Sequence, residues 1–117
     1  MKDMTTIDVK ALSSNRAWQG RRFKTPEYKA YEEEFLYKLP PLKIPEGRIE
    51  MHYLFGLSSK LNDVDNCIKS FQDVLQKKYG FDDRRIFRII AEKIEVNKGQ
   101  EFITFSFLPY SSTITDD

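Results

Sequence analysis

The chain has 117 residues, a formal net charge of +1, 40% hydrophobic residues and 32% charged residues. That length favours a single domain over residues 1–117. The only cysteine is Cys67, so an intrachain disulfide is excluded, and the only histidine is His52, so a zinc centre built on several imidazoles is excluded. Because no apolar run reaches membrane-spanning length and the N-terminus lacks a signal-peptide pattern, we expect a cytoplasmic protein.

The N-terminal half predicts a strand and then a helix. Apolar residues alternate with polar ones over residues 4–12, which is typical of a strand. Thr25-Pro26-Glu27 has the composition of a helix start, with a Thr cap followed by Pro. Apolar residues recur at helical spacing from there to Leu39, and Pro40 ends the helix.

The C-terminal half predicts strand, helix, strand, strand. Alternation predicts the strands, a 3.6-residue period predicts the helix, and Asn97-Lys98-Gly99-Gln100 predicts a hairpin turn between the last two strands. The whole chain is therefore expected to be α+β, with a β-α-β-α-β-β order and helices packed against one mixed sheet. The tail, residues 111–117, is expected to be flexible. The predicted elements are a strand at 48–55, a helix from about 65 to 79, and strands at 86–96 and 101–108.

Basic and aromatic residues are mixed between the first strand and the first helix. Arg16, Arg21, Arg22 and Lys24 occur there without an acidic residue, beside Trp18 and Phe23. Such a segment can bind phosphates and stack on unpaired bases. An ordinary solvated loop explains the same composition equally well.

The segment Asp63-Val64-Asp65-Asn66, followed by Lys69, carries the clearest chemical signal. Hard divalent cations prefer carboxylate oxygens, and side chains two residues apart share a face when the backbone is extended. Lys69 follows Asp65 by one helical turn, so it adds a positive charge beside such an ion. Acids, a metal and a lysine together suit phosphodiester cleavage. The structural alternative is that these Asp and Asn residues cap the helix.

Asp82-Asp83 lies between the second helix and the third strand. If that strand is adjacent to the second one, a third carboxylate could return to the same end of the sheet. Turn chemistry, in which Asp is common, explains this pair without a metal. His52 falls on the more polar face of its strand near Glu50, and we interpret it as a sheet histidine rather than a metal ligand.

These motifs resemble the RusA-type Holliday junction resolvases, small endodeoxyribonucleases of bacteria and their phages. The resemblance depends on Asp63-Val64-Asp65-Asn66-Cys67-Ile68-Lys69, then an amphipathic helix, then Gly80-Phe81-Asp82-Asp83. Ser14-Asn15 and the basic stretch after it add weaker support. The element order also fits, and the chain looks closest to the phage or prophage branch.

The resemblance implies a homodimeric hydrolase for DNA recombination and repair that binds four-way junctions and nicks two strands of like polarity with Mg²⁺ or Mn²⁺. The metal ligands would be Asp63, Asp65 and Asp83, and Lys69 would be the essential lysine. Asn66 and Asp82 would support them. The expected DNA-binding residues are Asn15, Arg16, Arg21, Arg22, Lys24 and Lys60.

One departure from the family concerns the residues before Asp63. The best-known members have a run of arginines there, whereas Ser58-Ser59-Lys60-Leu61-Asn62 offers one charge. Junction affinity, or the way in which the junction is opened, is therefore expected to differ. Three alternatives to a junction resolvase also stay open: a branched-DNA or flap nuclease of different specificity, a non-catalytic DNA-binding protein on the same fold, and a protein-interaction domain.

Overall fold

The computed structural model describes residues 4–11, 18–19, 23–24, 26–59 and 63–111. The expected β-α-β-α-β-β order is confirmed, and a two-residue strand pair is added within the basic segment. In chain order the elements are β1 (Thr5–Ile7), β2 (Trp18–Gln19), β3 (Phe23–Lys24), α1 (Pro26–Lys38), β4 (Ile49–Leu57), α2 (Val64–Tyr79), a single 3₁₀ turn η2 (Asp83–Arg85), β5 (Ile86–Glu95) and β6 (Phe102–Pro109).

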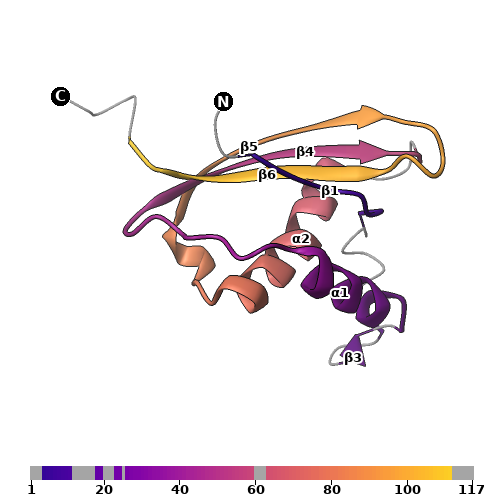
Figure 1. The fold of residues 1–117 in the computed structure, drawn as a ribbon, viewed down its shortest axis with the longest axis horizontal. Helices are drawn as coiled ribbons and strands as arrows, with labels where there is room; N and C mark the ends of the chain where they lie inside the picture. Colours follow the sequence, from indigo (N-terminus) through magenta and orange to yellow (C-terminus); the bar gives the residue numbers. More distant parts are fainter. Residues whose placement is uncertain (1–3, 12–17, 20–22, 25, 60–62, 112–117) are drawn as a thin grey trace.

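Four strands form one mixed sheet in the order β1-β6-β4-β5. β4 pairs in parallel with β5 and antiparallel with β6, and β6 pairs antiparallel with β1. Both helices lie on the same face of this sheet (Figure 1). The fold class is therefore α+β, as the sequence predicts.

The predicted hairpin between the last two strands is wrong. β4 lies between β5 and β6 and pairs with both, so the turn after β5 crosses the end of β4 instead of joining two neighbours. The Val96 backbone N–H donates to the Leu57 carbonyl oxygen at 2.9 Å, which holds this crossing against β4. Local turn chemistry therefore did not reveal strand order, because β4 has the most apolar inner face and occupies the centre of the sheet.

The first strand is shorter than the predicted 4–12. β1 ends at Ile7, where the Val9 N–H donates back to the Ile7 carbonyl oxygen at 3.0 Å and closes a tight turn. Val9 and Ala11 are nevertheless buried with Ile7, so the predicted apolar face is correct although the strand is not.

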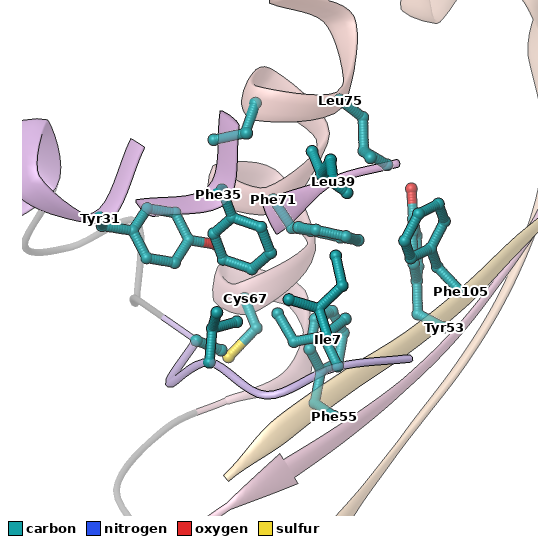
Figure 2. Packing of buried hydrophobic residues seen from close by; sticks show 14 of the residues in the cluster. Ile7, Tyr31, Phe35, Leu39, Tyr53, Phe55, Cys67, Phe71, Leu75 and Phe105 are labelled. Carbon is teal, nitrogen blue, oxygen red and sulfur yellow. The ribbon is translucent and has the colours of Figure 1, made fainter. Parts of the chain in front are cut away.

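Phe71 of α2 occupies the middle of the core (Figure 2). Its ring lies 5.1 Å from that of Phe35 on α1, and 5.3 Å from that of Phe105 on β6, measured between centroids. Tyr53 of β4 contacts the same ring at 5.7 Å. One fully buried aromatic side chain thus joins both helices to the two central strands, and aromatic pairs of this kind add stabilisation beyond simple burial.

α2 runs between well-defined ends. Asp63 is its N-terminal cap residue, and Gly80 ends it with a left-handed backbone at φ 69°. An L-residue with a side chain adopts that conformation only at a cost, which is why glycine stops helices so often. The helix therefore has the length that the sequence predicts, and this length decides where the acidic residues lie.

Candidate active site

Asp63 and Asp65 lie together at the N-terminus of α2. Asp63 has an extended backbone (φ −90°, ψ 147°), its carbonyl oxygen accepts from the Cys67 N–H at 3.2 Å, and its side chain makes no capping hydrogen bond. Both side chains are exposed. Asp63 therefore occupies the cap position without committing its carboxylate to it. The positive end of the helix dipole favours two acids here.

Lys69 is exposed one turn beyond Asp65. Residues four apart on a helix are neighbours on its surface, so the ammonium group and the Asp65 carboxylate share one region. Asn66, the remaining polar residue of the motif, is half-buried in the first turn. Two carboxylates and one ammonium group therefore lie at the N-terminal end of α2.

The surface that carries Asp65 and Lys69 continues along α2 through Gln72 and Gln76, and we call these four residues the outer flank. The Gln72 side-chain oxygen accepts from the Tyr53 hydroxyl at 2.7 Å, and the Gln76 side-chain oxygen accepts from the Asp83 backbone N–H at 3.1 Å. Both hydrogen bonds anchor the flank, to β4 at its middle and to η2 at its C-terminal end.

The α1 side of α2 is a neighbouring part of its surface. On the α1 side, Lys77 pairs with Glu32 at 2.6 Å, and Lys77 lies about 100° around the helix from Gln76. α1 is held near β1, where the Lys38 ammonium donates to the Asp8 carbonyl oxygen at 2.8 Å. α2 itself contacts α1, β4 and β5, and Gln72 ties the outer flank to β4.

Asp83 is at the opposite end of α2 from Asp63 and Asp65. It begins η2, after the helix has ended, and sixteen helical residues span about 24 Å. The described residues contain no group of three or more acidic, histidine or cysteine side chains placed to hold one ion. The expectation that a third carboxylate returns to the same end of the sheet is therefore not met within one chain.

The cause is the direction of β5. The third strand is adjacent to β4, as that expectation required, but it runs parallel to β4. In a parallel pair the connecting helix carries the chain back to the starting end of the first strand. Asp63 follows the end of β4, whereas Asp83 precedes the start of β5. The two residues therefore lie beyond opposite ends of these parallel strands.

Local contacts fix the turn that carries Asp83. The Asp82 carboxylate accepts from the Arg84 backbone N–H at 2.9 Å and from the Arg84 guanidinium at 2.8 Å, and these hydrogen bonds lower the pKa of Asp82. The Arg85 guanidinium donates to the carbonyl oxygens of Gly47 and Pro45. Asp82 thus caps η2 and holds Arg84, while Arg85 ties the turn to the loop before β4.

The sequence did not single out Lys93. It lies on β5 opposite Phe55, on the side of the sheet that the helices cover, and its charge acts on the Cys67 thiol together with those of Asp63 and Asp65. Burial is the largest cause and, together with the two acids, it outweighs Lys93 and raises the pKa of Cys67 to about 11. A second lysine therefore lies near the N-terminus of α2. Only strand pairing reveals it, because β5 is far from Asp63 in sequence.

Five of the six predicted DNA-binding residues lie outside the described part of the chain. Asn15, Arg16, Arg21, Arg22 and Lys60 lie outside the described residues. For Lys24 the backbone is described, in β3, where it pairs with Trp18 of β2.

His52 is a sheet histidine, as interpreted from the sequence. Its Nε2 atom lies 2.6 Å from a carboxylate oxygen of Glu50, which also pairs with Arg88 at 2.8 Å. This cluster is on the sheet face opposite the helices and contributes no ligand to the Asp63 region. Within the described part of the chain, no helix is both long and apolar enough to span a membrane.

Comparison with known families identifies the class of protein. The family model described as endodeoxyribonuclease RusA matches residues 9–104, which is most of the chain. A search of curated proteins found no match. The chain belongs to the RusA endodeoxyribonuclease family, so the resemblance based on Asp63-Val64-Asp65-Asn66 and Lys69 is confirmed. It is accordingly a DNA-cleaving hydrolase.

Proposed function

We propose that this chain is a divalent-metal-dependent endonuclease that resolves four-way DNA junctions as a homodimer, with one nick in each of two strands of like polarity. Family membership supports DNA cleavage. The observation that carries the finer proposal is the exposed pair Asp63 and Asp65, with Lys69 one turn away and with the Asp63 carboxylate unused in capping.

Mg²⁺ is the proposed ion, with Mn²⁺ as a substitute. Asp63 and Asp65 fit a hard cation, because both present exposed carboxylate oxygens at one helix end. Asp83 can bind the same ion only if it comes from a second copy of the chain. Within one chain, the length of α2 separates Asp83 from Asp63 and Asp65. A bound divalent ion supplies Lewis-acid polarisation of the scissile phosphate and activation of water.

The proposed catalytic residues of the chain are Asp63, Asp65, Lys69 and Asp83. The Lys69 ammonium stabilises negative charge that develops on the phosphate, or donates a proton to the leaving oxygen. The backbone N–H groups at the N-terminus of α2 favour a phosphate at the same place. Asn66 would orient a neighbouring carboxylate, and Asp82 keeps Arg84 in position beside Asp83.

DNA binding is proposed for the basic segment before α1 and for the loop before Asp63. Cationic side chains there would contact phosphates, and Trp18 or Phe23 would stack on bases at the junction centre. The proposed residues are Asn15, Arg16, Arg21, Arg22, Lys24 and Lys60.

Cleavage of a synthetic four-way junction tests the function. The protein is incubated with a junction labelled on each strand in turn, with Mg²⁺, with Mn²⁺ and with a chelator. We expect paired nicks on two like-polarity strands with either ion and none with the chelator. Three-way, flap and linear substrates are compared in parallel.

Each other outcome contradicts the proposal in a distinct way. Faster cleavage of flaps or three-way branches would indicate a nuclease of different specificity. Salt-dependent junction binding without cleavage in any divalent ion would indicate a non-catalytic DNA-binding protein. Junction binding that does not change with salt would indicate a protein-interaction domain instead.

A further inference from the structure

Lys93 is an exposed cation near the end of β5, on the side of the sheet that carries the helices. β4 and β5 are parallel neighbours, and Lys93 pairs in register with Phe55. Phe55 is fully buried in the core between the sheet and the helices. Because side chains alternate between the two faces along each strand, residues paired in register share a face. The Lys93 side chain therefore leaves the sheet on the helix side.

The level of Lys93 along α2 follows from two contacts between α2 and β4. α2 runs back along these strands, because it connects the end of β4 to the start of the parallel β5. The Gln72 side-chain oxygen accepts from the Tyr53 hydroxyl at 2.7 Å, and the rings of Phe71 and Phe55 lie 6.3 Å apart (Figure 2). Two strand residues and one helical turn cover similar lengths, about 6.6 Å and 5.4 Å. The step from Tyr53 to Phe55 therefore leads about one turn toward the N-terminus of α2.

Lys93 is thus level with the first two turns of α2, the turns that carry Asp65 and Lys69. The charges around Cys67, in the first turn, agree with this placement. Lys93 acts electrostatically on the Cys67 thiol, and so do Asp63 and Asp65. Because such interactions weaken with distance, one thiol group lies within reach of the ammonium and of both carboxylates.

We infer that Lys93 is a DNA-phosphate contact of the candidate active site, placed by the sheet on the strand side of Asp63 and Asp65, while Lys69 is placed by the helix. The inference rests on the proposed function, because it takes these two aspartates as metal ligands. Two elements far apart in sequence then each bring one lysine to the same carboxylates.

The formal charges of the proposed site explain why a second lysine is needed. The three proposed carboxylates, one divalent ion and the Lys69 ammonium together carry no net charge. Such a site has no net attraction for a DNA phosphate. The Lys93 ammonium makes the sum positive by one charge, which matches the single negative charge of one backbone phosphate.

An ion pair within β5 is the alternative role for Lys93. Glu95 lies two residues further on, in register with Leu57, and therefore shares the face of Lys93. The two roles differ in what the removal of Glu95 does. A lysine that serves only Glu95 loses its role in a Glu95→Gln variant, whereas a phosphate contact persists and gains from the loss of a nearby negative charge.

Junction binding in Ca²⁺ tests this contact without any cleavage. Lys93→Ala should weaken the affinity for a four-way junction by about 10-fold, since a hydrogen bond to a charged group is lost. The slope of log affinity against log salt should fall by about one, as expected for one phosphate contact. Lys98→Ala, in the turn after β5, removes the same charge from the same end of the sheet and is the matched control. Its affinity and salt slope should stay close to those of the wild type, and Glu95→Gln should bind equally well or more tightly.

A Lys93→Cys variant allows the charge to be restored chemically. Alkylation of the new thiol with 2-bromoethylamine displaces bromide and attaches an aminoethyl group, which rebuilds a side chain of lysine length with an ammonium at its end. Iodoacetamide modifies the same thiol without adding a charge. The native Cys67 is buried and its pKa is raised to about 11, so it reacts slowly with both reagents. Affinity and salt slope should return with the first reagent only.

Unchanged affinity and salt slope in Lys93→Ala would overturn the role of Lys93 and leave the proposed function standing. Equal recovery with both reagents would do the same, as would a Glu95→Gln variant that binds as weakly as Lys93→Ala. If Lys93→Ala does not fold by circular dichroism, Lys93→Gln replaces it. A wild-type protein that shows the expected lysine effects on binding, but cuts no branched DNA with Mg²⁺ or Mn²⁺, would remove the proposed function alone.

Discussion

The backbone N–H of Asp83 donates to the side-chain oxygen of Gln76 at 3.1 Å. This hydrogen bond holds Asp83 against the last turn of α2, on the flank that begins with Asp65. The two aspartates therefore lie on one side of the helix but at its opposite ends. A single chain therefore does not bring the two carboxylates to one ion.

Asp65→Asn should reduce cleavage of a four-way junction by at least about 100-fold while leaving junction binding equal or tighter. The amide keeps the size of the side chain but removes a charged metal ligand and a charge that repels phosphate. Cleavage is measured by strand mapping and binding by gel shift in Ca²⁺. Asp8→Asn, on an exposed aspartate near β1, is the control and should cut at the wild-type rate. Normal cleavage by Asp65→Asn would remove this residue from the site.

Lys69→Ala should lower the single-turnover cleavage rate by about 10²–10³-fold with little change in junction affinity, because the ammonium acts on charge that develops only in the transition state. Lys69→Arg should recover part of the rate. The control is Lys98→Ala, in the turn after β5. A loss of affinity with an unchanged rate would instead assign Lys69 to DNA binding.

Phe71→Ala should lower the free energy of unfolding by about 3–5 kcal/mol, because it opens a cavity between both helices and the central strands. Urea unfolding followed by circular dichroism measures this. Tyr37→Ala, at an exposed position on α1, should change it by less than about 0.5 kcal/mol. A small effect of Phe71→Ala would mean that the core is not centred on this ring.

Acid should destabilise the fold partly through Glu50. Its hydrogen bond with His52, together with the Arg88 pair, lowers the pKa of Glu50 below its ordinary value. A carboxyl group with a lowered folded-state pKa stabilises the protein above its unfolded-state pKa, about 4.3 for Glu, and loses that contribution as the pH falls through the folded-state value. Glu50→Gln should therefore be less stable than wild type at pH 7, with a difference that shrinks below about pH 4. A difference independent of pH would contradict this.

The sequence predicted the elements whose residues follow a local period. α1, β4, α2 and the apolar face through Ile7, Val9 and Ala11 all agree with the structure, since side-chain periodicity reports which face is buried. Gly80 likewise stopped α2 where predicted, because its φ is positive.

The predictions that failed concern the direction of a strand and the identity of the strand beside it. Nothing local to the turn after β5 shows that β4 separates β5 from β6. Nothing local to Asp83 shows that β5 is parallel to β4, which places that residue at the far end of α2. The exposed apolar residues of β5 gave a signal that was overlooked: Phe87, Ile89 and Ile90 are three apolar residues within four positions, and they cannot all face one core.

Mixing two inactive variants tests the central claim most directly. Asp65→Asn and Asp83→Asn proteins are each purified, mixed in equal amounts, exchanged through mild denaturation and refolding, and assayed on a labelled four-way junction. If the aspartates meet across two copies, each mixed dimer has one intact site. Cleavage should then return at about one quarter of the wild-type number of sites, as single nicks. A mixture as inactive as its components, although mixed dimers are present, would contradict the shared site.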